Sequence, residues 1–148
     1  MEYFDTAFIA KVYLQEEGSE VVRAEVAKLD ALACSVHGRV ELAFVFHRKY
    51  REGAIDKPGF HARMELVEKD TALGLIEWLP LDADVLEATW DSAKKLQRKI
   101  PLRAADALHL ASARDNGFKR VFSSDRHLLA GAKHYGLRGC DLLSGDIG

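Results

Sequence analysis

Four acidic residues interrupt otherwise apolar segments of this sequence. Asp5 ends the segment MEYFD, Glu41 lies within VELAFV, Asp106 lies within AADALHL, and Asp125 follows VFSS. Removing an unpaired carboxylate from water is costly, so such residues need a positive partner. A divalent metal ion shared by the four acids would supply that partner. The sequence therefore predicts a metal-dependent catalytic site.

Glu41 has no basic neighbour on its predicted helix. Its neighbours three and four residues away are His37, Gly38, Phe44 and Val45, so a surface salt bridge within the helix does not explain it. The alternative to a functional role is a partly exposed glutamate at the edge of the core.

Asp106 lies in a segment, 102–113, that is apolar nearly all round, which is typical of a buried helix. An ion pair with Arg103, one turn earlier, is the structural alternative for this acid. His109, one turn later, is either a supporting partner of the site or a core histidine with its hydrogen bonds satisfied.

Asp5 and Asp125 each precede a predicted helix, where an aspartate often serves only as the N-cap. Thr6 and Ser123 are open to the same two interpretations, because hydroxyl side chains at strand–helix junctions also cap helices. The functional prediction therefore depends on the four acids as a set.

A set of carboxylates selects a hard cation such as Mg²⁺ or Mn²⁺, which prefers oxygen ligands, over zinc. One or two such ions can activate a water molecule and stabilise charge on a phosphodiester. Without a metal, the acids would repel one another and raise at least one carboxyl pKa.

The composition is that of an ordinary globular protein. The 148 residues favour one domain spanning 1–148, and the net charge of −2 neither indicates nor excludes a nucleic-acid partner. No apolar run is long enough to span a membrane, and Asp5 interrupts the stretch where a signal peptide would develop. Cys34 and Cys140 lack metal-binding spacing, so we expect buried thiols and a cytoplasmic location.

Strand and helix patterns alternate along the chain, which predicts an α/β fold with a short, largely parallel central sheet flanked by helices. The predicted strands are Glu2–Phe4, Leu32–Cys34, Ile76–Leu79, Arg120–Ser123 and Leu137–Leu142. The predicted helices are Ala7–Leu14, one capped by Ser19, one from Ser35 or Val36 to about Gly53, Pro58 to about Leu75, one from Asp82 or Asp84 to about Gln97, one between Pro101 and Gly117, and Arg126–Tyr135. Val45, Trp78 and Trp90 belong either to the core or to an interface, and the core is the favoured placement.

In folds of this kind, ligands bind beyond the carboxyl ends of the strands. Asp5 and Asp125 follow predicted strands, while Glu41 and Asp106 fall in early helical turns. The pattern therefore brings the four acids toward one crevice.

A basic stretch is a second candidate feature. Lys94 and Arg98, like Lys95 and Lys99, are four residues apart, so they form one basic face leading toward Asp106, with Arg103 beyond. Such a face would contact RNA phosphates or would simply be solvated.

The acid-bearing segments resemble the motifs of the PIN-domain nucleases, and of the VapC-like toxins among them. The segment YFDTA is similar to the opening strand, aspartate and hydroxyl of the family, and Ser35 with Glu41 is similar to its second motif. RAADALHLASA is the most specific match, and VFSSDRHL resembles the last motif, with Ser123-Ser124 where a threonine and a variable residue are more usual. The resemblance covers essentially the whole chain.

This resemblance implies a three-layer PIN-like fold and a Mg²⁺- or Mn²⁺-dependent endoribonuclease. Our leading hypothesis for its substrate is structured RNA such as tRNA or rRNA. Asp5, Glu41, Asp106 and Asp125 would bind the metal, with Thr6 and Ser123 in support. It further implies a homodimer and an antitoxin whose C-terminal segment occupies the groove.

Three other functions stay open. The first is a PIN-domain nuclease of RNA maturation or decay that acts without an antitoxin, and the second is a non-catalytic binding module. A phosphotransfer enzyme with Asp5 as nucleophile is disfavoured, because Asp5-Thr6-Ala7 lacks an Asp-x-Asp pair.

Overall fold

The centre of the molecule is a five-stranded sheet. In the computed structural model, which describes residues 1–145, the strands are β1 (Glu2–Phe4), β2 (Leu32–Ser35), β3 (Ile76–Leu79), β4 (Arg120–Phe122) and β5 (Arg138–Cys140). They lie in the order β3-β2-β1-β4-β5, and each neighbouring pair is parallel. The carboxyl ends of all five strands therefore meet at one edge, as the largely parallel sheet predicted from the sequence requires.

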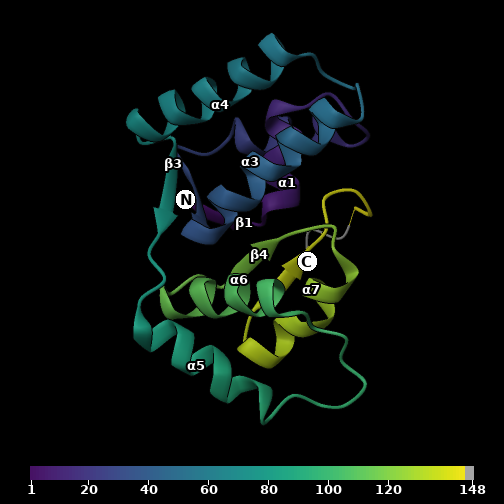
Figure 1. Cartoon of the computed structure of the whole chain (residues 1–148). Coiled ribbons are helices and arrows are strands. Elements are labelled where there is room, and N and C mark those ends of the chain that lie inside the picture. Colours follow the sequence, from purple (N-terminus) through teal and green to yellow (C-terminus); the bar gives the residue numbers. More distant parts are fainter. Residues whose placement is uncertain (146–148) are drawn as a thin grey trace.

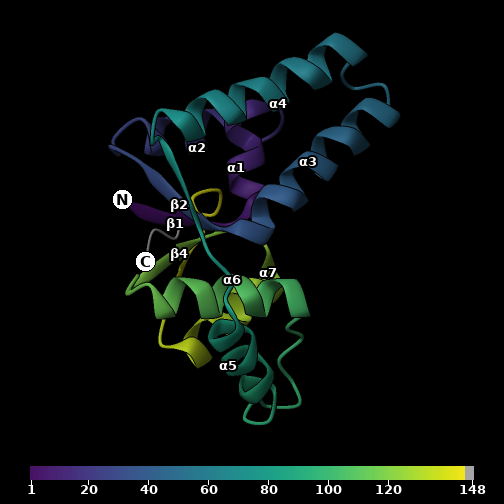
Figure 2. The same ribbon diagram turned by 60° about the vertical axis from the view of Figure 1, so that its left-hand side comes forward.

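The helices form a layer on each side of this sheet. They are α1 (Thr6–Tyr13), α2 (Ser19–Val26), α3 (Val36–Arg51), α4 (Lys57–Ala72), α5 (Ala83–Ala93), α6 (Ala104–Asp115) and α7 (Arg126–Ala132), followed by the 3₁₀ turn η1 (Lys133–Tyr135). Figures 1 and 2 show α1–α4 on one side and α5–α7 on the other. The predicted three-layer α/β fold is confirmed.

Alternate residues of the strands supply two separate cores, because successive side chains of a strand point to opposite faces. Phe4 and Cys34 pack in the core under α1 and α3. Tyr3 and Ala33 pack in the core shared with α6 and α7. The two helical layers are thus joined mainly through the strands, and the carboxyl edge of the sheet lies between them.

Strand register aligns the ends of β1 and β4. Phe4 pairs with Phe122, and the backbone N–H of Asp5 donates to the carbonyl of Phe122 at 3.0 Å. Asp5 and Ser123 are therefore the first residues beyond two adjacent strands, and Asp125 follows two positions later. This register places two distant parts of the chain side by side.

Two predicted helices end earlier than their sequence patterns indicated. The helix expected to reach Leu75 ends at Ala72, where Gly74 has a positive φ of 74° that stops the helix. The helix expected to reach Gln97 ends at Ala93, where Lys94 bonds to the carbonyl of Asp91 in a tighter three-residue turn. In both cases the backbone geometry ended the helix earlier than the sequence pattern predicted.

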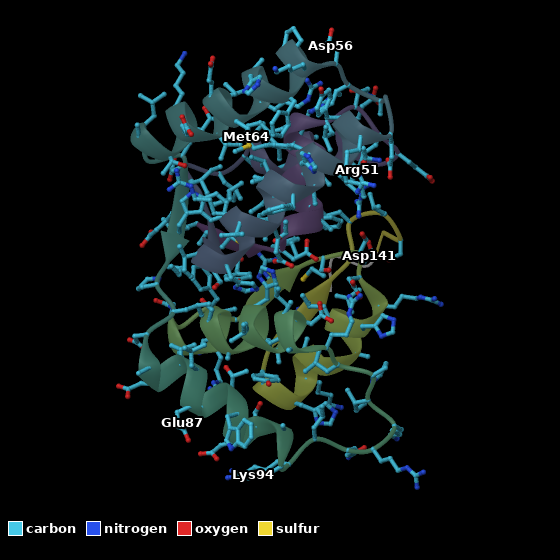
Figure 3. The ribbon with its side chains drawn as sticks, in the orientation of Figure 1. Arg51, Asp56, Met64, Glu87, Lys94 and Asp141 are labelled. Carbon is cyan, nitrogen blue, oxygen red and sulfur yellow. The ribbon has the colours of Figure 1, made fainter. Side chains whose placement is uncertain are left out.

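The early end of α5 overturns the predicted basic helical face. Lys94, Lys95, Arg98 and Lys99 lie in turns and irregular chain, so their spacing does not align them. Figure 3 shows Lys94 at the far end of α5 from α3 and α1. Arg103 belongs to the same predicted basic set but does not lie in this stretch, because it directly precedes α6.

The remaining differences are small. The helix predicted after Pro101 begins at Ala104, and the one predicted as Arg126–Tyr135 is divided into α7 and η1. Val45 and Trp78 pack against the core, as favoured from the sequence. Trp90 is 70% exposed, so the favoured core placement was wrong for this residue and the interface alternative stays open. No helix among residues 1–145 has the length and apolar character to cross a bilayer.

Candidate active site

The four predicted acids line one pocket at the carboxyl edge of the sheet. Asp5, Glu41, Asp106 and Asp125 all face a cavity of about 270 Å³ between the two helical layers. Asp5 and Glu41 come from the layer of α1 and α3, whereas Asp106 and Asp125 come from α6 and the start of α7. The convergence expected from strand ends and early helical turns is therefore present.

Asp5 is both a helix cap and a pocket residue. Its Oδ1 accepts a hydrogen bond from the backbone of Phe8 at 2.9 Å, and its Oδ2 accepts one from the hydroxyl of Ser123. Only 3% of Asp5 is exposed, and this burial raises its pKa to about 6 despite the two hydrogen bonds. The ionised carboxylate therefore lacks full compensation by the protein's own groups.

Glu41 lies in the second turn of α3 and is held by three side chains. Its Oε1 accepts a hydrogen bond from Thr6 Oγ1 at 2.8 Å and lies 2.8 Å from Nε2 of His109. Nε2 of His37 lies 3.5 Å from the same oxygen. Burial acts to raise the pKa of Glu41, but the contacts with His109 and Thr6 outweigh it and lower the pKa. The alternative interpretation of Glu41, a partly exposed glutamate at the edge of the core, does not explain these contacts.

Asp106 and Asp125 share one cation. Nε of Arg103 donates to Asp106 at 2.8 Å, so the ion pair considered from sequence is present, and the same guanidinium also bonds to Asp125. Asp125 caps α7 by accepting from the backbone N–H of His127 at 2.8 Å. Burial acts to raise the pKa of Asp125, but these backbone and guanidinium contacts lower it overall.

Sequence reasoning placed His109 near the site but did not identify its partner. His109 is 3% exposed, and its two ring nitrogens lie 2.7 Å from the hydroxyl of Tyr3 and 2.8 Å from Glu41. Burial acts to lower its pKa, but adjacent Cys34 and Glu41 raise it to about 10. His109 is thus a satisfied core histidine that supports Glu41, not Asp106.

Sequence reasoning missed two basic residues that line the pocket, Lys11 and Arg48, and gave little weight to His37 beside Glu41. Lys11 and Arg48 line the same pocket, and their positions on α1 and α3 give no distinctive sequence motif. From the sequence, His37 was noted only as a neighbour of Glu41. Its spacing of four residues from Glu41 was the signal that could have predicted their contact. Its ring lies 4.2 Å from that of His109, centre to centre.

The donor chemistry of the pocket suits a hard divalent cation. Four carboxylates converge. Burial raises the pKa of Asp5, whose hydrogen-bond donors, the Phe8 N–H and the Ser123 hydroxyl, are uncharged, while Arg103 lies beside Asp106 and Asp125. Carboxylate oxygens are the ligands that Mg²⁺ and Mn²⁺ prefer. The residues present therefore fit the predicted class of metal.

Comparison with protein-family models decides the family. The model described as the PIN domain matches residues 3–134. The chain belongs to the PIN-domain family. Comparison with curated protein sequences finds no match.

Two solved structures illustrate the shared PIN fold. VapC20 of Mycobacterium tuberculosis, described as a toxin that cleaves the sarcin–ricin loop, is 16% identical with a TM-score of 0.69, over 88% of this chain and 95% of that one. A chain of FitAB bound to a DNA fragment is also 16% identical, with a TM-score of 0.68, over 97% of this chain and 96% of that one. At this identity, the likeness is one of fold.

Proposed function

We propose that this PIN-domain protein is a metal-dependent endoribonuclease and the toxin of a VapBC-type toxin–antitoxin pair. The observation that carries the proposal is the convergence of four carboxylates from both helical layers on one pocket. A binding module that kept these acids for stability would have no need of a buried Asp5 with a pKa raised to about 6. Structured RNA, such as tRNA or rRNA, is the proposed substrate.

The four acids would hold Mg²⁺ or Mn²⁺, which when bound would activate a water molecule and offset charge at the phosphodiester. The protein's own groups orient these acids. Ser123 and the start of α1 hold Asp5, while Thr6 and His109 hold Glu41. Lys11 and Arg48, on the rim of the pocket, would attract the RNA backbone.

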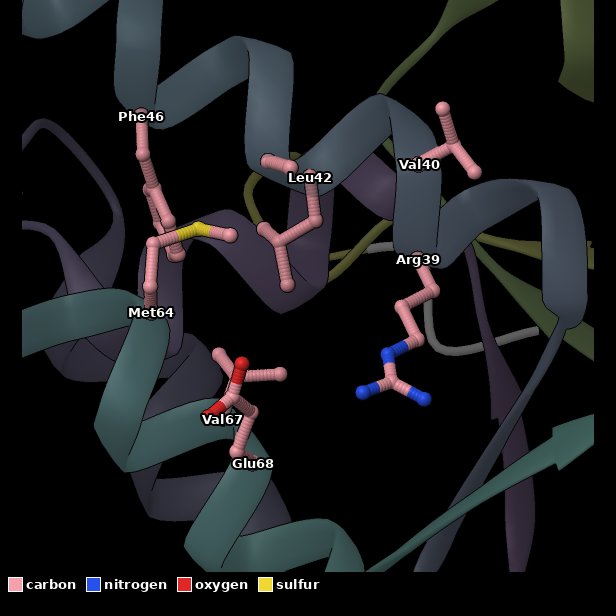
Figure 4. Close-up of a pocket in the computed structure, with 8 residues that line it drawn as sticks. Arg39, Val40, Leu42, Phe46, Met64, Val67 and Glu68 are labelled. Carbon is pink, nitrogen blue, oxygen red and sulfur yellow. The ribbon is translucent and has the colours of Figure 1, made fainter. Parts of the chain in front are cut away.

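An apolar groove between α3 and α4 is the proposed binding site of the antitoxin. Figure 4 shows Leu42 and Phe46 of α3 on the side that faces Met64 and Val67 of α4. These residues line a cavity of about 260 Å³. Val40 of α3 also lines this groove and is 60% exposed. A largely apolar segment of a small partner fits such a surface. The likeness in fold to a VapC toxin and to FitAB supports a partner of this class.

We also propose that the protein acts in the cytoplasm, as one domain and as a homodimer. Leu86 and Trp90 of α5 are 48% and 70% exposed beside the apolar groove between α5 and α6, and they would suit contact with a second copy.

The decisive experiment compares Asp106→Asn with wild type on purified structured RNA with Mg²⁺. Asp115→Asn, at the exposed end of the same helix, is the matched control. We expect Asp106→Asn to lose at least about 100-fold in cleavage rate. Removing a metal ligand should lower activity more than removing a residue that only hydrogen-bonds to a ligand. Wild-type cleavage by Asp106→Asn would refute the nuclease assignment.

The alternatives predict different results. A nuclease of RNA maturation or decay would cleave RNA but would have no small open reading frame immediately upstream of its gene. A non-catalytic module would show neither cleavage nor a rise in melting temperature with millimolar Mn²⁺.

A further inference from the structure

Three potential metal ligands of mixed type lie together beside the acidic pocket. His37 and Glu41 are one turn apart on α3, and His109 of α6 faces them. Among residues 1–145 this is the one group of three histidine, cysteine or acidic side chains whose ligand atoms all lie within 4.8 Å of one another. The four acids of the pocket do not cluster so tightly.

Two of the three distances in this group are close to those of a tetrahedral metal site, and all its ligand atoms lie within 4.8 Å of one another. Nε2 of His109 and Nε2 of His37 lie 2.8 Å and 3.5 Å from Oε1 of Glu41. Ligands about 2.0–2.1 Å from a tetrahedral zinc ion are roughly 3.3 Å apart, so small side-chain movements suffice. Pocket solvent reaches the group, because Glu41 and His109 both line the cavity.

Each imidazole has a partner for its other nitrogen, as metal-bound histidines usually do. Nδ1 of His109 lies 2.7 Å from the hydroxyl of Tyr3, and Nδ1 of His37 lies 2.8 Å from Oγ of Ser35. With the ring protons on these Nδ1 atoms, both Nε2 lone pairs point into the group. Nε2 of His37 would then give up its 3.2 Å contact with the carbonyl of Ala105.

Gly38 allows the two helices to approach closely enough for this arrangement. A Cβ at this position would lie 3.2 Å from Cε1 of His109, 3.0 Å from Oγ1 of Thr6 and 2.5 Å from Sγ of Cys34. The ring of His109 therefore packs against the backbone of α3 between the two ligands that this helix supplies.

We propose that His37, Glu41 and His109 form a second metal site, selective for a borderline transition-metal ion such as Zn²⁺ over Mg²⁺. Two imidazoles and one carboxylate suit such an ion, whereas the hard cations prefer oxygen alone. Because Glu41 belongs to both sites, Zn²⁺ binding withdraws it from the acidic pocket and inhibits cleavage. This inhibition rests on the proposed nuclease function, but the binding itself does not.

The test is a titration of the purified protein with Zn²⁺ against a chromophoric chelator, with Co²⁺ absorption as a second readout. We expect one Zn²⁺ per chain, and a Co²⁺ spectrum of a tetrahedral nitrogen–oxygen site. His37→Gln should weaken binding by at least about tenfold, because it removes one ligand. His47→Gln, an exposed histidine of the same helix, should leave binding unchanged.

Asp106→Asn separates this site from the acidic pocket. The proposal expects Zn²⁺ binding to survive in Asp106→Asn and to fall in His37→Gln. The reverse pattern, or no stoichiometric Zn²⁺ binding by wild type, would overturn it. RNA cleavage with Mg²⁺ is measured separately, so loss of the zinc site leaves the nuclease test intact, and failure of the nuclease test leaves zinc binding intact.

Discussion

Nε of Arg103 donates a hydrogen bond to Oδ2 of Asp106 across 2.8 Å, one turn into α6. The other end of the guanidinium bonds to Asp125, although 58% of the Arg103 side chain is exposed. A positive group of the protein thus lies between two of the acids proposed to bind metal. An incoming cation must displace it or share the carboxylates with it.

Removing this guanidinium should strengthen metal binding. We expect Arg103→Gln to raise the affinity for Mn²⁺ severalfold, because the metal no longer competes with a fixed cation for Asp106 and Asp125. Electron paramagnetic resonance of free Mn²⁺ measures the affinity, with Arg98→Gln as the control for net charge. Equal affinities in the two variants would show that Arg103 does not compete with the metal.

Asp5→Asn should stabilise the metal-free protein at neutral pH. The pKa of Asp5 is raised from 3.8 to about 6 in the folded state, so its contribution to stability is full below pH 3.8 and is lost as pH rises through 6. An amide avoids this loss, and we expect a gain of roughly 2–3 kcal/mol at pH 7.

The measurement is urea unfolding in the presence of a chelator at several pH values. The advantage of Asp5→Asn should shrink as pH falls from 6 toward 4. Adding Mg²⁺ should favour the wild type instead, because only its carboxylate gains a metal. A pH-independent difference would mean that burial of the charge is not the cause.

Gly38→Ala should destabilise the protein although alanine is the better helix former. At an open helical position this change would stabilise by about 1 kcal/mol. Here the new Cβ would lie 2.5 Å from Cys34 Sγ, so we expect a loss of about 1–3 kcal/mol. Chemical denaturation measures the loss, and Arg39→Ala is the exposed control on the same helix. A stabilised Gly38→Ala variant would show that α3 and β2 do not pack this closely.

RNA binding should depend more on Arg48 than on the basic turn after α5. Arg48 lines the acidic pocket, whereas Lys99 lies in the turn that was wrongly predicted as a helical face. We expect Arg48→Ala to weaken RNA binding. The slope of log affinity against log salt concentration should also fall by about one, which corresponds to one lost phosphate contact. Lys99→Ala should change both much less. Titrations at several salt concentrations compare the two variants, and the opposite order would restore the basic stretch as the RNA surface.

Antitoxin binding should be lost when the groove between α3 and α4 becomes charged. Val40 is 60% exposed in this groove, so Val40→Asp should preserve folding while opposing an apolar partner. Val21→Asp changes a similarly exposed valine on α2. Co-purification with the product of an adjacent small open reading frame measures binding. Undiminished binding to Val40→Asp would place the partner elsewhere.

The strands were predictable because their signals are local. Short segments rich in apolar residues, such as Ile76–Leu79, are bounded by breakers, and Asp5 and Asp125 could be placed at strand ends from this pattern. Helix ends were less accessible. The chain beyond Ala93 keeps a helical spacing of charges, but its backbone changes to a tight turn that this spacing does not encode.

Contacts between residues that are distant in the sequence could not be predicted either. No local pattern could reveal that His109 contacts Glu41 or that Arg103 spans to Asp125, because these contacts depend on how α6 crosses the sheet edge. The one pairing foreseen in detail, Arg103 with Asp106, lies within a single helical turn.

The order of strands in the sheet has a consequence for synthesis of the protein. Strand β4 lies beside β1 at the centre of the sheet but is made after six of the seven helices. A growing chain that has not reached Phe122 leaves β1 with an open edge and cannot bring Asp125 beside Asp5. If the protein is the nuclease we propose, a nascent or prematurely terminated chain is harmless to the RNA of the ribosome that makes it.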